Sequence, residues 1–309
     1  MASLILALTF VSCASEVFID LPEEPPRLVA IGHFTDGDLF RVRLSFSQNY
    51  DEPSPLPPPE DADVTIAVGG QSMQRLRRVR GANGDFIWEG LRPAELGVNY
   101  TLVAKVQGYP RIEATSAVPI HRPLAGYSAD AGSVQHVQMQ DGMRLARAPI
   151  RLRPSELPPD KRFFAFSLQY EIEVFEQLPN GQIVVDYTYL TSPRESSFTS
   201  DGRTIALLSD LTRLYEPLIL INEKFWNSPD ASVNIDALIR YNPRFERPVN
   251  VLVEWRTLSP EYYWYFLSLA SQGSAPPLTE PDAVFNNVLN GYGNFSGYSF
   301  SIDTIRLDL

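Results

Sequence analysis

The chain has 309 residues, of which 44% are hydrophobic and 20% charged. It is therefore long and apolar enough for one large domain or two average ones, and it is neither a disordered tail nor a fibre. Its 37 acidic residues outnumber its 26 basic ones, and the formal net charge of -11 argues against nucleic acid as a partner. A single cysteine excludes an intrachain disulfide, and three widely spaced histidines form no sequence-local zinc site.

The chain begins with an uncharged apolar run, residues 2–12, which ends at Cys13. This run is too short to span a bilayer as a helix but has the length of the apolar region of a signal peptide. Ser12 followed by Cys13 is similar to a bacterial lipobox. We therefore expect residues 1–12 to be a signal peptide, Cys13 to be lipidated, and residues 13–26 to form a polar, proline-bearing tether. The alternative is a buried strand or helix with Cys13 as an ordinary core thiol.

Past the tether the dominant hydrophobic period is two, which is typical of half-buried antiparallel strands. Apolar and polar residues alternate over 39–47, and turn signals separate this segment from similar ones. The pattern recurs at 64–68, 100–106 and 112–118. It predicts a β-sandwich of immunoglobulin or transthyretin type over residues 27–120, in which the Tyr100 hydroxyl closes a corner.

Residues 121–149 have weak periodicity and several glycines and prolines, so we expect a linker or irregular segment there. The apolar run 163–175 leads through Asn180-Gly181 to a second strand over 182–190, which predicts a β-hairpin. Further strands are expected at 203–209, 216–222, 233–241 and 248–256. The fold class predicted is mostly β, with the N-terminal sandwich followed by a larger β-rich C-terminal domain over residues 150–309.

One helix is expected in the C-terminal domain, over residues 260–271. Ser259 supplies an N-cap, Pro260 suits the first helical position, and Glu261 places an acid in the first turn. The helix is aromatic on nearly all sides, so it either packs between a sheet and loops or exposes rings to a partner. The packing interpretation is favoured, because the rings supply bulk to a β-rich core.

No pattern in the sequence points to catalysis. It holds no nucleophile elbow, zinc-protease helix or phosphate-binding loop, so we expect no enzymatic activity, although carboxylates that only the fold brings together are left open. The acids at positions 36, 38, 61 and 63 are interpreted as solvated turn residues, not as a calcium site. No metal and no cofactor is expected.

The most specific string in the chain lies near its C-terminal end, over residues 280–298. With Ser259-Pro-Glu-Tyr-Tyr263 and the opening segment 19–32, it resembles a Bacteroidota lipoprotein family catalogued as domain of unknown function 4249. The string departs from the family pattern at Asn294, where an aliphatic residue is expected, and at Val288, which replaces isoleucine. Its asparagines and glycines are interpreted as turn-forming residues, with Phe295 in a core.

The resemblance implies a secreted outer-membrane lipoprotein, found beside TonB-dependent transporters, with no established enzymatic activity and no catalytic residues to carry over. The hypothesis is a non-catalytic accessory or ligand-capturing component of a TonB-dependent uptake system, held to the outer membrane by its lipid anchor. Whether it faces the surface or the periplasm stays open. The alternative is a structural or assembly component of the envelope without a small ligand. Aromatic residues expected to be exposed are the candidates for ligand or partner contact: Trp226, Tyr262, Tyr263, Trp264 and Tyr292.

Overall fold

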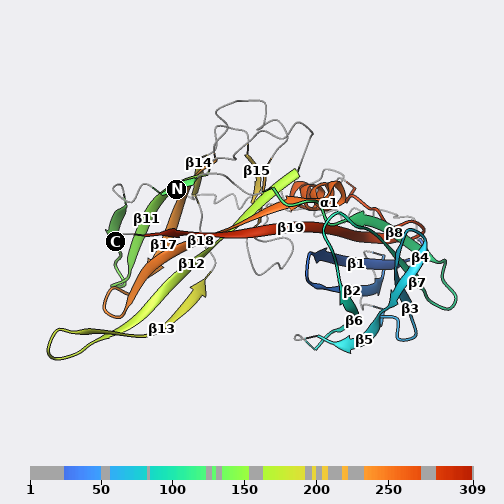
Figure 1. Cartoon of the computed structure of the whole chain (residues 1–309), viewed down its shortest axis with the longest axis horizontal. Coiled ribbons are helices and arrows are strands. Elements are labelled where there is room, and N and C mark those ends of the chain that lie inside the picture. The colour runs from blue at the N-terminus through green and yellow to red at the C-terminus, as the bar shows by residue number, and fades with distance from the viewer. Residues whose placement is uncertain are drawn as a thin grey trace, which may run out of the picture.

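The computed structural model shows a mostly β molecule with two halves joined by a long sheet (Figure 1). It describes residues 24–49, 56–81, 84–122, 127–129, 134–152, 163–191, 197–199, 204–207, 218–221, 233–272 and 283–307. Cys13 and Trp226 lie outside the described residues, as does nearly all of the proposed signal peptide and tether. Within the part that is described, no helix combines the length and the apolar character needed to cross a membrane.

The strands of the N-terminal half are β1 (Leu28–Thr35), β2 (Leu39–Phe46), β3 (Asp63–Val68), β4 (Gln71–Arg75), β5 (Arg77–Arg80), β6 (Phe86–Pro93), β7 (Asn99–Lys105) and β8 (Ile112–Ala117). The four-stranded sheet β4-β3-β7-β8 packs against β1, β2 and β6 of the long sheet, and one hydrophobic core fills the space between them. The alternation seen in the sequence places Phe40, Val42 and Leu44 of β2 in that core. A sandwich-like arrangement is thus confirmed, whereas the immunoglobulin or transthyretin type stays a prediction.

Tyr100 has the structural role expected of it. Its ring is buried, and its hydroxyl accepts a hydrogen bond of 2.8 Å from the backbone N–H of Glu95. This bond fixes the turn that precedes β7 to the strand itself, as a tyrosine corner does.

The C-terminal half contains β9 (Tyr127–Ala129), β10 (Gln135–Gln138), β11 (Arg144–Leu152), β12 (Phe163–Gln177), β13 (Ile183–Thr191), β14 (Ser197–Thr199), β15 (Thr204–Leu207), β16 (Leu218–Ile221), β17 (Val233–Tyr241), β18 (Glu246–Leu258), α1 (Pro260–Gln272) and β19 (Tyr292–Arg306). The predicted hairpin is confirmed: β12 and β13 pair antiparallel, and Gly181 has a φ of 83° in the turn between them. The smaller sheet, β10-β11-β17-β14 with β9, covers β12 and β18, and a second core lies between these layers.

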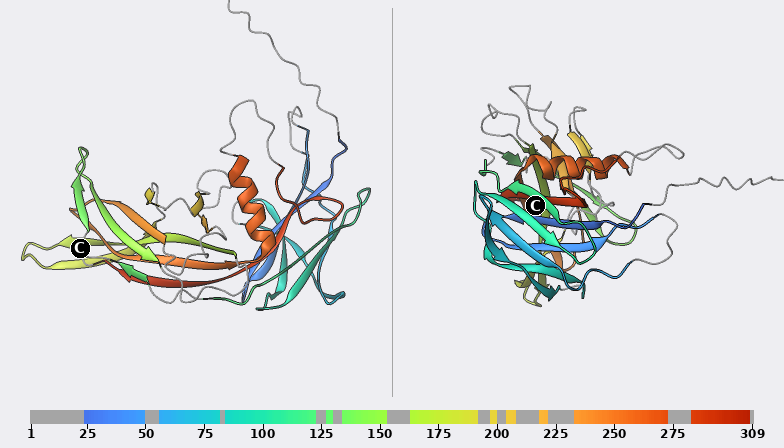
Figure 2. Two further views of the ribbon diagram at one scale, coloured as in Figure 1. Left: turned by 90° about the horizontal axis from the view of Figure 1, so that it is seen from above. Right: turned by 90° about the vertical axis from the view of Figure 1, so that its right-hand side faces the viewer.

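The predicted helix is confirmed as α1, which lies across the sheet where the two halves meet (Figure 2). The Ser259 side chain caps it by accepting a hydrogen bond of 3.3 Å from the N–H of Tyr262. Ser116 of β8 contacts both Ser259 and Glu261, so the helix start is tied to the N-terminal half. A third hydrophobic core lies beneath the helix.

β19 belongs to both halves. Its first part, Tyr292 to Tyr298, pairs in parallel with β1, and its second part, Tyr298 to Arg306, pairs antiparallel with β18. Phe295 therefore lies in the N-terminal core and Ile305 in the C-terminal one. Residues 121–149, expected to be a linker or irregular segment, contain β9, β10 and the first part of β11. The proposed division of the chain there stays a prediction, but β19, assigned to the C-terminal domain, completes the N-terminal half as well.

Candidate functional site

Two of the rings proposed as exposed contacts are buried. Tyr262 and Tyr263 are each 2% exposed, so the expectation that they face a ligand or partner is wrong for both. Tyr263 stacks on Phe163 of β12 at 4.4 Å between ring centroids, and Tyr262 packs on Phe266 at 4.5 Å. The physical reason is that α1 presents these rings to the sheet, which is the packing alternative for the helix.

The other described candidates keep some exposure. Trp264 is 42% exposed, on the outer side of α1. Tyr292 is half-buried: its hydroxyl donates to Glu24, and the Arg27 guanidinium lies 5.3 Å from its ring centre. Contact with a partner stays a prediction for these two residues, and the fifth candidate, Trp226, lies outside the described residues.

The asparagine and glycine string has the structural role predicted for it. Asn287 binds the backbone of Phe295 twice, accepting from its N–H at 3.0 Å and donating to its carbonyl at 2.8 Å. Asn290 and Gly293 adopt positive φ values of 61° and 118°. A side chain at Gly293 would lie 2.0 Å from the Ala30 carbonyl oxygen, so only glycine lets β19 approach β1.

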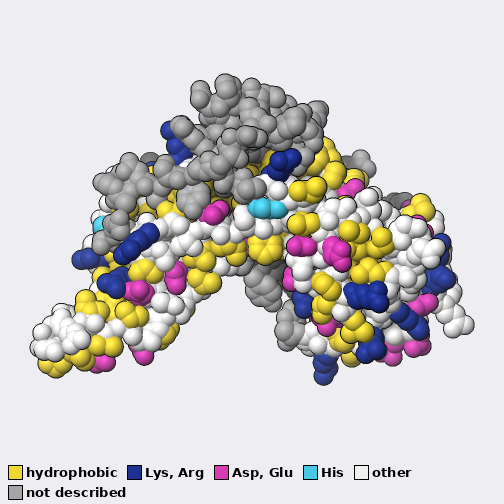
Figure 3. Space-filling model, in the orientation of Figure 1, with side chains coloured by type: hydrophobic (Ala, Val, Ile, Leu, Met, Phe, Trp, Pro, Cys, Tyr) yellow, Lys and Arg dark blue, Asp and Glu magenta, His cyan; other side chains and the backbone are white. Residues whose placement is uncertain are grey.

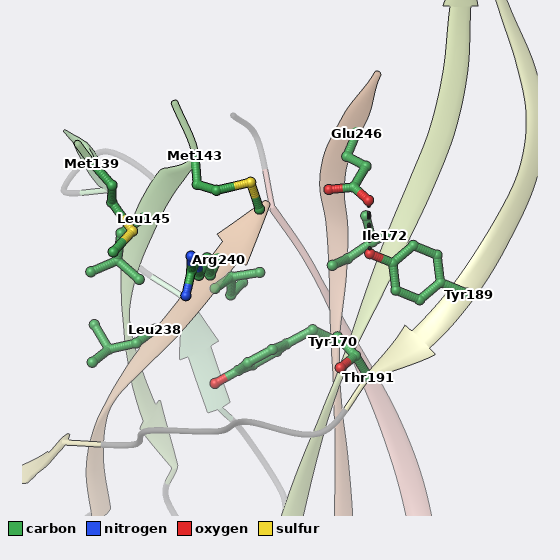
Figure 4. Close-up of a pocket in the computed structure, with 11 residues that line it drawn as sticks. Met139, Met143, Leu145, Tyr170, Ile172, Tyr189, Thr191, Leu238, Arg240 and Glu246 are labelled. Atoms are coloured by element: carbon green, nitrogen blue, oxygen red, sulfur yellow. Dashed lines mark hydrogen bonds between the residues drawn. The ribbon is translucent and has the colours of Figure 1, made fainter. Parts of the chain in front are cut away.

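A pocket of about 520 Å³ opens in the C-terminal half, between the smaller sheet and the long one (Figure 4). On one side it is lined by β11, β17 and the turn before β11, and on the other by β12, β13 and the start of β18. Much of the lining is apolar: Met139, Met143, Leu145, Ile172 and Leu238. Thioether side chains adapt their shape to what they contact, so this wall can accommodate an irregular apolar surface.

The Tyr170 hydroxyl is the distinctive polar group of this pocket. The residue is 2% exposed, and its ring extends from β12 across the pocket towards Leu238 of β17 (Figure 4). The hydroxyl is buried near the Leu238 backbone but makes no hydrogen bond of good geometry. Burial raises the pKa of Tyr170, so the phenol stays protonated and can donate.

The charged groups of the pocket already have partners. Glu246 accepts hydrogen bonds from the Tyr189 hydroxyl at 3.2 Å and from the Asn242 N–H at 2.6 Å. Arg240 pairs with Asp141, whose pKa is lowered first by a hydrogen bond from the Met143 N–H and then by the guanidinium. An entering molecule would therefore find one buried donor without a good acceptor, the Tyr170 hydroxyl.

None of the four described candidate rings lines this pocket, and sequence reasoning missed the residues that do. One signal was available: Met139 and Met143, two of the four methionines of the chain, flank a single turn. The other lining residues come from strands up to about a hundred positions apart, so only the fold brings them together. In the residues that the structure describes, no three metal-ligating side chains cluster.

The comparisons with known proteins place the chain in a family and leave its function open. No curated protein matches it. Among solved structures, one match is the wild-type C-terminal domain of the AgI/II polypeptide BspA from Streptococcus agalactiae, at 8% identity over 76% of this chain and 96% of that one. Its TM-score is 0.15, which is too low to indicate a shared fold. The family model named domain of unknown function (DUF4249) matches residues 14–302, and with this match across nearly its whole length the chain belongs to the DUF4249 family.

Proposed function

We propose that the protein is a non-catalytic, lipid-anchored component of an outer-membrane, TonB-dependent uptake system, and that it captures a small amphipathic molecule. The capture role depends on one observation, the pocket of mixed apolar and polar lining that holds the buried Tyr170 hydroxyl, a donor without a good acceptor. The anchor is supported by Cys13 after its apolar run, and the uptake role by the family resemblance.

The pocket chemistry favours an uncharged ligand with an apolar body and an oxygen acceptor. The methionine, leucine and isoleucine side chains would contact the body, and the Tyr170 hydroxyl would donate to the oxygen. A charged ligand is disfavoured, because Glu246 and Arg240 are already neutralised or hydrogen-bonded by neighbours. Glu246 is also the one carboxylate among the described lining residues, whereas hydrolysis by acid-base chemistry commonly uses a facing pair.

Prodan, an uncharged naphthalene dye with one ketone oxygen, provides a direct test. We expect saturable binding with a shift of its emission to shorter wavelengths, because the dye leaves water and contacts the apolar side chains of the pocket. Tyr170→Phe should weaken binding by about two- to tenfold, the value of one hydrogen bond. Met143→Glu should abolish it, since it places a charge on the apolar wall.

Tyr187→Phe is the matched control, because Tyr187 is 55% exposed on β13 and does not line the pocket, so we expect the loss of its hydroxyl to leave binding unchanged. Prodan that binds Met143→Glu as tightly as the unaltered protein would contradict capture in this pocket.

The alternative, a structural or assembly component without a small ligand, gains support from the exposed apolar strand β13. Purification of the tagged protein from detergent-solubilised outer membrane, with Cys13→Ala as control, tests the uptake role. We expect a TonB-dependent barrel at near-equal yield that is lost in the control. Recovery of the protein alone would argue against a stable transport complex.

A further inference from the structure

We propose that the outer edge of β13 is a docking site for an extended segment of another protein in which apolar and basic residues alternate. This segment would add to the sheet as a further strand beside β13. The inference does not depend on the pocket, although Tyr189 and Thr191 of the same strand line it.

The backbone of β13 offers an open edge. Among the described strands β13 pairs with β12 only, so the opposite side of its backbone has no strand partner there. The hairpin extends away from the body of the molecule (Figure 1). β13 has nine residues, whereas the other described strands at sheet edges have three to six. A long open edge is what an incoming strand needs, and natural proteins commonly shorten or block edges that are not used.

The side chains of β13 are apolar and exposed. Of the sixteen large hydrophobic residues that are exposed in the described part of the chain, five lie on this one strand: Ile183, Val184, Val185, Tyr187 and Leu190. Because successive residues of a strand point to opposite faces, apolar side chains are exposed on both faces of the hairpin. Yellow, hydrophobic side chains are visible on this projecting part in Figure 3. Exposure of this kind marks interaction surfaces.

The charges of the hairpin indicate the kind of partner. Residues 163–191 contain four acidic residues and no lysine or arginine. Glu171 and Glu173 are held by Asn250 and Arg247 of β18. Glu176, on β12 opposite Val184, and Asp186, at the β-bulge of β13, are exposed. A partner strand with lysine or arginine between its apolar residues would complement these two carboxylates.

A second copy of this chain fits the edge less well. Pairing of two β13 strands would bring two acid-only hairpins together, on chains that each carry a formal net charge of -11. Like charges at facing or diagonal positions destabilise a strand pair. The occupant favoured by the structure is therefore a different protein.

The test uses a synthetic peptide of nine residues, the length of β13, in which valine alternates with lysine. Its affinity for the full chain is measured by fluorescence anisotropy. We expect saturable binding, weakened at least about tenfold by Val185→Lys, since lysine on an edge strand blocks strand addition and repels a basic partner. Leu91→Lys is the matched control, because Leu91 is 63% exposed on β6, in the other half of the molecule, and should leave the affinity unchanged.

An N-methylated version of the peptide separates strand addition from simple charge attraction. It keeps the charges and side chains but cannot donate backbone hydrogen bonds, so we expect it to lose binding. Equal binding of the N-methylated peptide, or equal loss with Leu91→Lys, would overturn the proposal. Self-association of the chain that Val185→Lys abolishes would also overturn it, in favour of a second copy. Prodan binding is also measured for Val185→Lys. If this variant still binds the dye, its loss of peptide affinity comes from the edge of β13 and not from damage to the pocket.

Discussion

His33 is a half-buried imidazole that packs against aromatic rings, and its Nε2 atom is buried. Its ring centre lies 5.2 Å from that of Tyr262 and 5.1 Å from that of Phe266, and its Nε2 has no hydrogen-bond partner. Burial lowers the pKa of His33 to about 4, and the positive charge of Arg256 acts in the same direction, while Asn294 opposes it. Asn294 is itself fully buried and donates to the Glu261 carbonyl at 3.1 Å, so this polar side chain is hydrogen-bonded in the core at a position where the resemblance leads us to expect an aliphatic residue.

The lowered pKa of His33 predicts a loss of stability in mild acid. The unfolded imidazole titrates near 6.5 and the folded one near 4, so the unfolded state binds more protons between these values and stability falls as the pH is lowered through them. Between about pH 7 and pH 5 we expect the free energy of unfolding to fall by about 2 kcal/mol more than in His33→Phe. Urea unfolding at both pH values measures this. Equal losses in the two proteins would contradict a His33 that is neutral in the folded state. The lowered pKa of His121 adds the same loss of stability to both proteins, so it does not affect the comparison.

At the scale of elements, the parallel pairing of β19 with β1 depends on Gly293. A Cβ there would lie 2.0 Å from the Ala30 carbonyl oxygen, in addition to the strain of a φ of 118°. We expect Gly293→Ala to cost more than about 4 kcal/mol or to prevent folding. Gly37→Ala is the control: Gly37 also has a positive φ, of 79°, but nothing lies within 4 Å of its added Cβ, so strain of about 1–2 kcal/mol is expected. The stability of the two variants is compared by thermal unfolding. Equal losses of stability would show that the close approach of β19 to β1 at Gly293 is unimportant.

The elements were more predictable than their contacts. Alternation of apolar residues located β2, β3 and β7, and the Ser259-Pro260 pair located the start of α1, because these signals are local. The burial of Tyr262 and Tyr263 was not predictable, since a helix that is aromatic on nearly all sides does not show which rings face the sheet. The pocket was equally hidden: Tyr170 has the same alternation as its buried neighbours, and its position opposite Leu238 follows only from the packing of two sheets.

At the scale of the whole molecule, β19 couples the two halves. Because it pairs with both β1 and β18 and contributes to both cores, we expect the halves to unfold together. Phe295→Ala opens a cavity in the N-terminal core and should cost about 3–5 kcal/mol. Hydrogen exchange in increasing urea should show that this substitution destabilises β17 as well as β2. If β17 keeps its original stability while β2 loses it, the halves are independent.

The same strand sets the order in which the molecule can be completed. β19 is synthesised after every other described strand, and until Tyr292 to Arg306 leave the ribosome, β1 lacks its parallel neighbour and the N-terminal core lacks Phe295. The half that is translated first therefore cannot finish folding first, contrary to the usual sequence for chains built of separate domains. A nascent chain must keep its exposed apolar surface soluble until translation reaches the last strand. A truncated chain that ends before Tyr292 would lack β19, and both of its halves would be incomplete. Proteases and chaperones would therefore recognise such a chain at once.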